Sequence, residues 1–170
     1  VASILLLYLA STLYHALQIL RDWAAQADPL IADLERLQAE DTDLLRLREW
    51  LSAVQHANAA LDMAALVNTG PLLCTLLYRV AAETELPSLP SAWLRWDLPQ
   101  AEGYYALLIG PAEERETVEH DLSAQRVRRI PLPSRLHGTP RAAGGQVDAR
   151  LQVHAKRREE LLRALHESHE

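Results

Sequence analysis

The strongest constraint on this fold is a long stretch that lacks helix-breaking residues. The forty residues from Asp28 to Val67 contain no glycine, and their only proline is Pro29, where a helix tolerates it. A sustained seven-residue repeat is typical of a coiled-coil-like helix, whose apolar stripe needs a partner in water. We therefore predict one long helix over residues 28–67, with Asp28 as its N-cap. The repeat runs through Leu30, Leu37, Leu44, Leu51, Asn58 and Ala65.

The apolar stripe changes its phase partway along this segment. Leu34 supports the repeat early, whereas Leu47, Val54 and Leu61 support it later. The change falls in the polar run 40–43, where we expect a kink or local unwinding. Asn58 would be a polar residue at an apolar position, a device that can fix the register of paired helices.

A second helical pattern near the end of the sequence offers a partner for this stripe. Residues 146–170 are strongly charged, with an apolar line at helical spacing. We predict a helix over residues 147–166, which pairs with the long helix of its own chain or of a neighbouring one. The line consists of Val147, Leu151, His154, Arg158, Leu161, Leu162 and Leu165.

The first 27 residues form a separate segment. Residues 1–20 hold no Asp, Glu, Lys or Arg, so their length reaches the lower limit for a membrane span. However, Ser11, His15, Gln18 and Asp22 recur at spacings of three and four, which places them on one helix face. We predict an amphipathic helix packed on protein; insertion in a membrane is the alternative.

Residues 68–145 change to strand-like patterns, which indicates a small α/β head. An apolar run follows the break at Asn68–Pro71, and Tyr104–Ile109 reads as another strand. Gly110 ends that strand, a helix follows Pro111, and 126–132 reads as a further strand. Residues 91–97 are expected to form a loop or a short helix. The predicted class is α+β and mostly helical, with a coiled-coil-like hairpin (28–67 and 146–170) carrying the head.

No pattern of catalytic or metal-binding residues stands out. The Gly110-Pro111 turn lacks a phosphate-loop signature, and the acidic residues after it would repel an anion. Cys74 lies in an apolar run typical of a core, and His120 has no partner at triad spacing. His166 and His169 offer at most a weak metal site. We therefore predict no catalytic residue, cofactor or metal. The formal net charge of −6 disfavours nucleic acid as a partner.

Between about residues 61 and 166 the sequence shows a series of apolar runs, helix lengths and proline stops. The segments are PLLCTLLYRVAAETELP (71–87), YYALLIG (104–110), EERETVEHDLSAQ (113–125) and VRRIPLP (127–133), before GTPRAA (138–143) leads into the returning helix. In these segments the chain resembles the cytoplasmic N-terminal region of the I (a-type) subunit of V/A-type rotary ATPases, and the resemblance covers about two thirds of the chain. The N-terminal strand and lobe of that family and its membrane region have no counterpart here, and the first twenty residues look foreign to it.

The resemblance implies a mechanical role. Such a subunit would belong to the stator, lie in the cytoplasm against the inner face of the membrane, and hold helical peripheral-stalk proteins. Trp93, Trp96, Tyr104 and Tyr105 are then the candidate interface residues, because aromatic side chains are favoured as interface anchors. One alternative is a stand-alone coiled-coil scaffold, and another is a protein anchored in a membrane through residues 1–20.

A shorter resemblance concerns the first segment. YLASTLYHAL (Tyr8–Leu17) is similar to the second transmembrane helix of the haemolysin III family. That resemblance would make Ser11 and His15 metal ligands. Because no later segment reads as a membrane span, we do not expect a metal site here.

Overall fold

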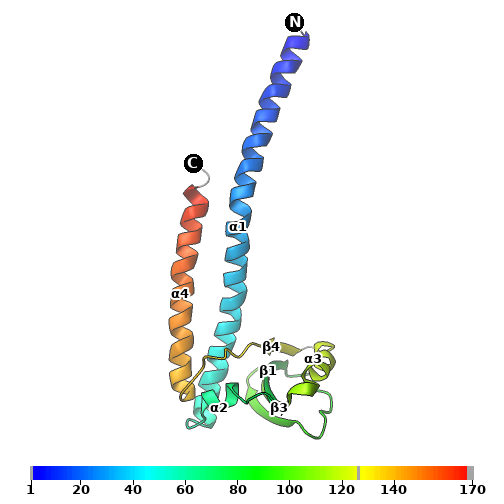
Figure 1. Cartoon of the computed structure of the whole chain (residues 1–170), viewed down its shortest axis with the longest axis vertical. Helices are drawn as coiled ribbons and strands as arrows, with labels where there is room; N and C mark the ends of the chain where they lie inside the picture. The colour runs from blue at the N-terminus through cyan, green and yellow to red at the C-terminus, as the bar shows by residue number, and fades with distance from the viewer. Residues whose placement is uncertain (1, 126, 168–170) are drawn as a thin grey trace. The chain divides into compact units, whose positions relative to one another are not determined.

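The structure, a computed structural model, describes residues 2–125 and 127–167, with residues 2–10 described by their backbone alone. It combines helices with one antiparallel sheet, as the predicted α+β class requires (Figure 1). The elements in chain order are α1 (Ala2–Ala57), α2 (Met63–Val67), β1 (Leu73–Ala81), β2 (Leu94–Gln100), β3 (Gly103–Pro111), η1 (Ala112–Glu114), α3 (Arg115–Ser123), β4 (Val127–Ile130) and α4 (Pro140–Glu167).

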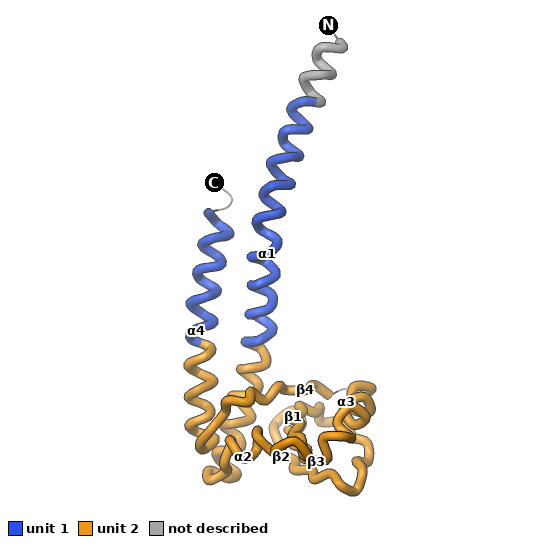
Figure 2. Tube along the Cα trace, in the orientation of Figure 1, with its two compact units in different colours: residues 1–41, 152–170 blue, residues 42–151 orange. Residues whose placement is uncertain are grey.

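The chain divides into two compact units, coloured in Figure 2. The helix unit consists of residues 1–41 and 152–170 and contains parts of α1 and α4. The sheet unit consists of residues 42–151 and contains the four strands with the helical segments around them. The four-part division at residues 27, 67 and 145 stays a prediction.

The predicted helix start at Asp28 is wrong, because α1 is already helical from Ala2 onward. Pro29 lies inside the helix, although an internal proline costs about 3 kcal/mol by losing one hydrogen bond. Its side chain is exposed, while Ala27 is 1% exposed and Leu30 is half-buried. Burial of the apolar line on both sides of Pro29 offsets that cost and keeps the helix continuous.

The end of α1 also differs from the prediction. The helix stops at Ala57, and Asn58 forms a turn in which its side-chain Oδ1 accepts from the Ala60 amide at 3.3 Å. Asn58 therefore does not lie on the helix seam, and Ala65 belongs to the separate helix α2. Asparagine favours turns because its side chain bonds the nearby backbone, and here that tendency exceeds the seven-residue repeat.

Helix α4 is longer than predicted and begins at Pro140. The Oγ1 atom of Thr139 accepts from the Ala142 amide at 3.3 Å, so Thr139 caps the helix and Pro140 takes its first position. Gly144 and Gly145 lie within the helix, where each costs about 1 kcal/mol relative to alanine. The prediction of a helix over 147–166 is confirmed within these wider limits.

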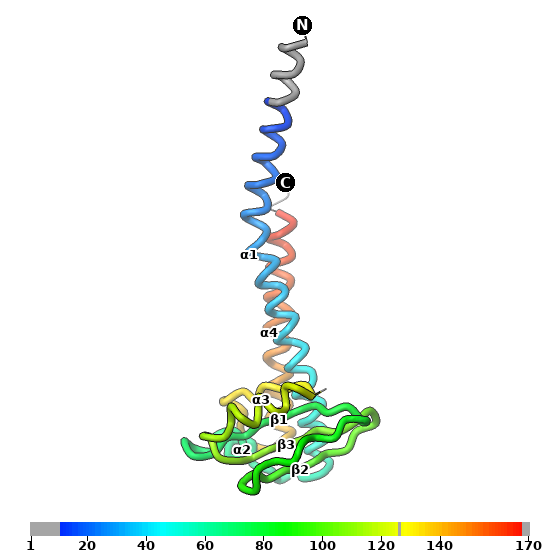
Figure 3. The backbone as a smooth tube through the Cα atoms, turned by 90° about the vertical axis from the view of Figure 1, so that its right-hand side faces the viewer, coloured from blue at the N-terminus to red at the C-terminus, as the bar shows by residue number. Residues whose placement is uncertain are grey.

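The sheet has the strand order β2-β3-β1-β4, and every neighbouring pair is antiparallel (Figure 3). Because β3 and β4 both run antiparallel to β1, which lies between them, they are parallel to each other. Helix α3 connects β3 to β4 along the chain, so the predicted strand-helix-strand unit is present. Strand β1 lies between these two strands in the sheet. Strand β4 covers Val127–Ile130 of the predicted 126–132, and residue 126 lies outside the described residues.

The reading of residues 91–97 as a loop or short helix is wrong, because β2 begins at Leu94. Strand β2 pairs along its length with β3, with Trp96 opposite Leu107 and Leu98 opposite Tyr105. The sequence LRWDL alternates apolar and charged residues, which is the pattern of a half-exposed strand. The prolines close to this segment favour a loop prediction over a strand. Pro99 is nevertheless compatible with β2, because β2 is an edge strand.

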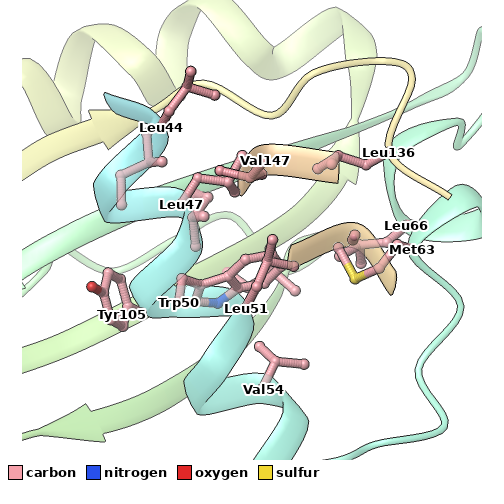
Figure 4. Packing of buried hydrophobic residues seen from close by; sticks show 14 residues of the cluster. Leu44, Leu47, Trp50, Leu51, Val54, Met63, Leu66, Tyr105, Leu136 and Val147 are labelled. Carbon is pink, nitrogen blue, oxygen red and sulfur yellow. The ribbon is translucent and has the colours of Figure 1, made fainter. Parts of the chain in front are cut away.

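The two faces of the sheet belong to two different hydrophobic clusters. On one face, Leu77 and Leu107 pack with Trp50 and Leu51 of α1 and with Val147 of α4 (Figure 4). On the other face, Leu76 and Leu108 pack with α3 and with the loop before β2. The residues from outside the sheet that complete the second cluster are Leu86, Trp93, Val118 and Leu122.

Candidate interaction surface

The four aromatic residues predicted as interface anchors do not form one surface. Trp93 and Tyr104 pack with the cluster under α3, whereas Trp96 and Tyr105 pack with the cluster under α1. Tyr104 and Tyr105 are neighbours in a strand, so their side chains point to opposite faces. Trp93 and Tyr105 are only 7% and 2% exposed, so the area available to a partner lies on Trp96 and Tyr104.

Trp93 is held as a core residue by two contacts. Its Nε1 donates to the Glu114 carboxylate at 2.8 Å. Its ring lies against Gly110, where an added Cβ would come within 2.2 Å of Trp93 Cδ2. This close approach explains why residue 110 is a glycine, so Gly110 has a packing role. The prediction that Gly110 ends the strand is wrong, because β3 continues to Pro111.

Tyr105 lies between the sheet and α1. Its hydroxyl donates to Oε2 of Glu49 at 3.1 Å, and the Arg79 guanidinium lies 5.0 Å from the ring centroid. Burial, followed by the negative charge of Glu49, raises the pKa of Tyr105 to about 12. The phenol is therefore neutral at physiological pH and joins the strand to the helix.

Tyr104 belongs to a polar group on the other face. Arg95 Nη2 donates to the Tyr104 hydroxyl at 3.3 Å, and its guanidinium lies 5.6 Å from the ring centroid. The same guanidinium donates to both carboxylate oxygens of Asp97, at 2.8 and 2.7 Å. These hydrogen bonds raise the pKa of Arg95, so this part of the face carries a fixed, charge-paired group.

An exposed apolar area lies at one end of the sheet. Leu94 of β2 is 71% exposed, and Leu73 of β1 is 46% exposed. Leu94 pairs with Ile109, which also pairs with Thr75, so strand alternation places Leu73 and Leu94 on the α1-facing side of the sheet. We name Leu73 and Leu94, with the half-buried Ile109 and Trp96 beside them on the same face, the sheet-end patch.

An open groove lies between α1 and the last residues of β2, at the opposite end of this strand from Leu94. It is lined by Ser52 and His56 of α1 and by Leu98 and Pro99 of β2. The groove is open to solvent, and Arg48 at its side is already paired with Asp148 at 2.8 Å. Small ligands bind best in enclosed apolar sites, so this groove fits a protein contact better.

The remaining candidates for chemistry lie apart from one another. Cys74 is buried, and burial raises the pKa of its thiol, which disfavours the reactive thiolate. His120 lies on the exposed side of α3, opposite the buried Val118 and Leu122. His166 is exposed in the last turn of α4, and His169 lies outside the described residues.

The two residues that the resemblance to a transmembrane helix would make metal ligands lie on the surface of α1. Ser11 and His15 are both exposed on α1. Within residues 2–125 and 127–167, no group of three His, Cys, Asp or Glu side chains could hold a metal ion. Among the same residues, no helix has the combination of length and apolarity needed to cross a membrane.

Comparison with known proteins finds a similarity to solved structures alone. No family model matches the chain, and no curated protein matches its sequence. The chain is similar to a crystal structure of the cytoplasmic N-terminal domain of subunit I, a homolog of subunit a, of V-ATPase. The match has 18% identity and a TM-score of 0.39, covering 92% of this chain and 66% of that chain. At these values the likeness stops short of a shared family.

Proposed function

We propose that this chain is a non-catalytic structural subunit of the stator of a proton-translocating rotary ATPase, and that it binds helical peripheral-stalk proteins. The segments on which the sequence resemblance rests fall on β1, β3, α3 and β4. They therefore supply three strands of one sheet and the helix on its face. In this role the protein resists torque, so it works through rigid contacts and contains no catalytic group. The proposed location is the cytoplasm, at the membrane surface through its partners.

The sheet-end patch is the observation that carries this proposal. On the same face of the sheet, Leu77 and Leu107 are covered by Leu47 and Leu51 of α1. This face therefore already accepts a helix, and at Leu94 and Leu73 its apolar surface continues without a cover. A helix of another protein that lies across these leucines would bury them as α1 buries their neighbours. Exposed apolar area of this kind marks a protein contact more often than chance.

The patch can be tested with stalk proteins from a rotary ATPase. The purified chain is mixed with them, and the complex is measured by native mass spectrometry and by pull-down. We expect a complex with the unmodified chain and at least about a tenfold loss of affinity for Leu94→Glu, because the charge would be buried in the contact. Val153→Glu is the matched control, since Val153 is 63% exposed on α4, in the other unit.

The outcomes separate the proposed function from a general scaffold role. No complex with any stalk protein would contradict the stator assignment. A complex that Leu94→Glu leaves intact would keep the stator role but remove the patch from it. A partner outside the ATPase that requires Leu94 would instead favour a stand-alone scaffold.

A further inference from the structure

Three arginine side chains of the sheet unit gather on the side of the sheet that α1 covers. Arg79 of β1 is directly opposite Arg128 of β4 in the strand register, and on its other side it is opposite Tyr105 of β3. Tyr105 packs in the cluster under α1 (Figure 4), so residues opposite it share this face. Oδ1 of Asp43 on α1 lies 3.5 Å from Nη2 of Arg128 and 3.6 Å from Nη1 of Arg46. We name Arg46, Arg79 and Arg128 the arginine cluster.

The carboxylates beside the arginine cluster offset its charge only in part. Like charges directly opposite each other on neighbouring strands destabilise a sheet, so Arg79 and Arg128 need a counter-charge. The single Oδ1 atom of Asp43 serves both Arg46 and Arg128, and its distances of 3.6 and 3.5 Å exceed those of a close charged hydrogen bond. The other nearby carboxylate, that of Glu49, accepts from the tyrosine hydroxyl of β3. Three positive charges therefore meet two negative ones.

Two of the three guanidinium groups also carry buried donors. Nη1 of Arg46 and Nη1 of Arg79 are buried and have no hydrogen-bond acceptor among the described residues. Buried polar groups are nearly always hydrogen-bonded, and a charged donor without an acceptor is a costly exception. Arg79 is held in place, because its Nη2 donates to the backbone carbonyl of Glu102 at 3.2 Å and its guanidinium lies 5.0 Å from the Tyr105 ring centroid. These contacts fix the guanidinium while Nη1 remains able to bond an acceptor from outside the chain.

We propose that the arginine cluster is an anion site, and that its ligand is a phosphate group. The planar guanidinium fork matches the geometry of phosphate oxygens. A phosphate group has several strong acceptor oxygens that point in different directions, so one ligand serves donors from α1, β1 and β4. It enters at the β4 edge of the sheet, where the side chains of Arg128 and Asp43 are 55% and 32% exposed.

Free phosphate and the phosphate of a small organic monoester share this chemistry. The site lies toward the other end of β1 from Leu73, so it is separate from the sheet-end patch. Its use does not depend on the proposed stator function.

The test is isothermal titration calorimetry of the whole 170-residue chain with inorganic phosphate, at an ionic strength held constant with sodium chloride. We expect saturable binding with a Kd below about 1 mM, and at least about tenfold weaker binding in Arg79→Gln and Arg128→Gln, since each loses a charged donor. Circular dichroism verifies the fold of both variants. Arg128 is the safer substitution, because its side chain is 55% exposed.

Arg129→Gln is the matched control. Arg129 follows Arg128 in β4, but it lies on the opposite face, where its Nη1 is 2.7 Å from Oε1 of Glu119 on α3. The change removes the same charge outside the arginine cluster, so the affinity for phosphate is expected to stay within about twofold.

Asp43→Asn is expected to act in the opposite direction. The Asp43 carboxylate competes with phosphate for the donors of Arg46 and Arg128, so removing its charge is expected to tighten binding at least about threefold. Weaker binding in Asp43→Asn would contradict the site, because a neighbouring negative charge cannot strengthen an anion contact.

Titration with glycerol 3-phosphate separates the two sources of the phosphate group. Binding equal to or weaker than that of inorganic phosphate assigns the site to the free anion, and at least about tenfold tighter binding assigns it to a monoester.

Four results would overturn the proposal. The first is binding that does not saturate up to about 10 mM phosphate. The second is sodium acetate that binds as well as phosphate, because a carboxylate would then suffice. The third is phosphate binding that neither Arg79→Gln nor Arg128→Gln weakens, because the site would then lie elsewhere. The fourth is a loss in Arg129→Gln as large as that in Arg128→Gln, because binding would then follow net charge alone.

Discussion

Nδ1 of His154 on α4 lies 2.7 Å from Oδ1 of Asp41 on α1, and both residues are 8% exposed. An ionised carboxylate can only accept, so Nδ1 donates and the imidazole tautomer is set by this contact. Arg158 pairs with the second carboxylate oxygen of Asp41, and Nε2 of His154 lies 3.6 Å from Glu40. A polar group on a helix seam aligns the two helices, because any shift would leave a buried charge without a partner.

Replacing Asp41 with alanine is expected to lower the free energy of unfolding by about 2–4 kcal/mol, since it leaves the buried imidazole and Arg158 without their acceptor. Urea unfolding followed by far-ultraviolet circular dichroism measures the loss. Asp33→Ala is the matched control on the same helix. Asp33 pairs with Arg36 at 2.9 Å, but these side chains are 40% and 67% exposed. The control is expected to change stability by less than about 1 kcal/mol. Equal losses in the two variants would contradict the role given to Asp41.

The close contact between Gly110 and Trp93 leads to a second prediction. Gly110→Ala is expected to destabilise the chain by about 1–3 kcal/mol, because its Cβ would overlap the indole ring and force the core to shift. Gly144→Ala is the opposite case. Gly144 lies inside α4 with no atom within 4 Å of an added Cβ, so alanine is expected to stabilise the helix by about 0.5–1 kcal/mol. Thermal unfolding of the two variants measures whether each change lowers or raises stability. A stabilising Gly110→Ala would refute the packing role.

Helices α1, α3 and α4 and three of the four strands could be predicted in outline from the sequence, because their patterns are regular, whereas α2 was taken as part of the long helix. Leu37, Leu44 and Leu51 recur every seven residues, and all three are buried in the structure. The helix ends were less predictable, since a single local signal competes with packing there. Asp28 and Pro29 form a good start signal, but the buried line through Ala27 and Leu30 continues the helix across it.

The interface residues could not be separated from core residues by sequence. Trp93 and Tyr105 have the residue types that favour interfaces, and the same types fill cores. Whether such a side chain is buried depends on which strand lies beside it. β2 pairs with β3, and this pairing places Trp93 over Gly110 and Trp96 on the opposite face. The exposed Leu94 and Leu73 were missed because an exposed leucine has no sequence signal of its own.

Two buried tryptophans differ in their hydrogen bonding, which gives a third prediction. Trp50 is fully buried, and its Nε1 has no hydrogen-bond partner among the described residues, whereas Trp93 Nε1 donates to Glu114. Phenylalanine removes the N–H group in both cases and leaves a similar gap. Trp93→Phe is therefore expected to lower the free energy of unfolding by about 1–2 kcal/mol more than Trp50→Phe does, because only the change at Trp93 removes a hydrogen bond. Urea unfolding of both variants measures this difference, and a larger loss for Trp50→Phe would contradict it.

The raised pKa of Tyr105 predicts how stability changes at high pH. The pKa is about 12 in the folded chain and about 10 in the unfolded chain, so the unfolded state loses its proton first as the pH rises. Stability from this group is complete below about pH 10, and roughly 2–3 kcal/mol is lost as the pH approaches 12. Urea unfolding at a series of pH values measures how steeply stability falls with pH.

Tyr105→Phe removes the titrating group, so the stability of this variant is expected to fall less steeply over this range. Burial also raises the pKa of Tyr78, so this residue accounts for part of the pH dependence that remains in Tyr105→Phe. An unchanged slope in Tyr105→Phe would show that Tyr105 ionises as easily in the folded chain as in the unfolded one.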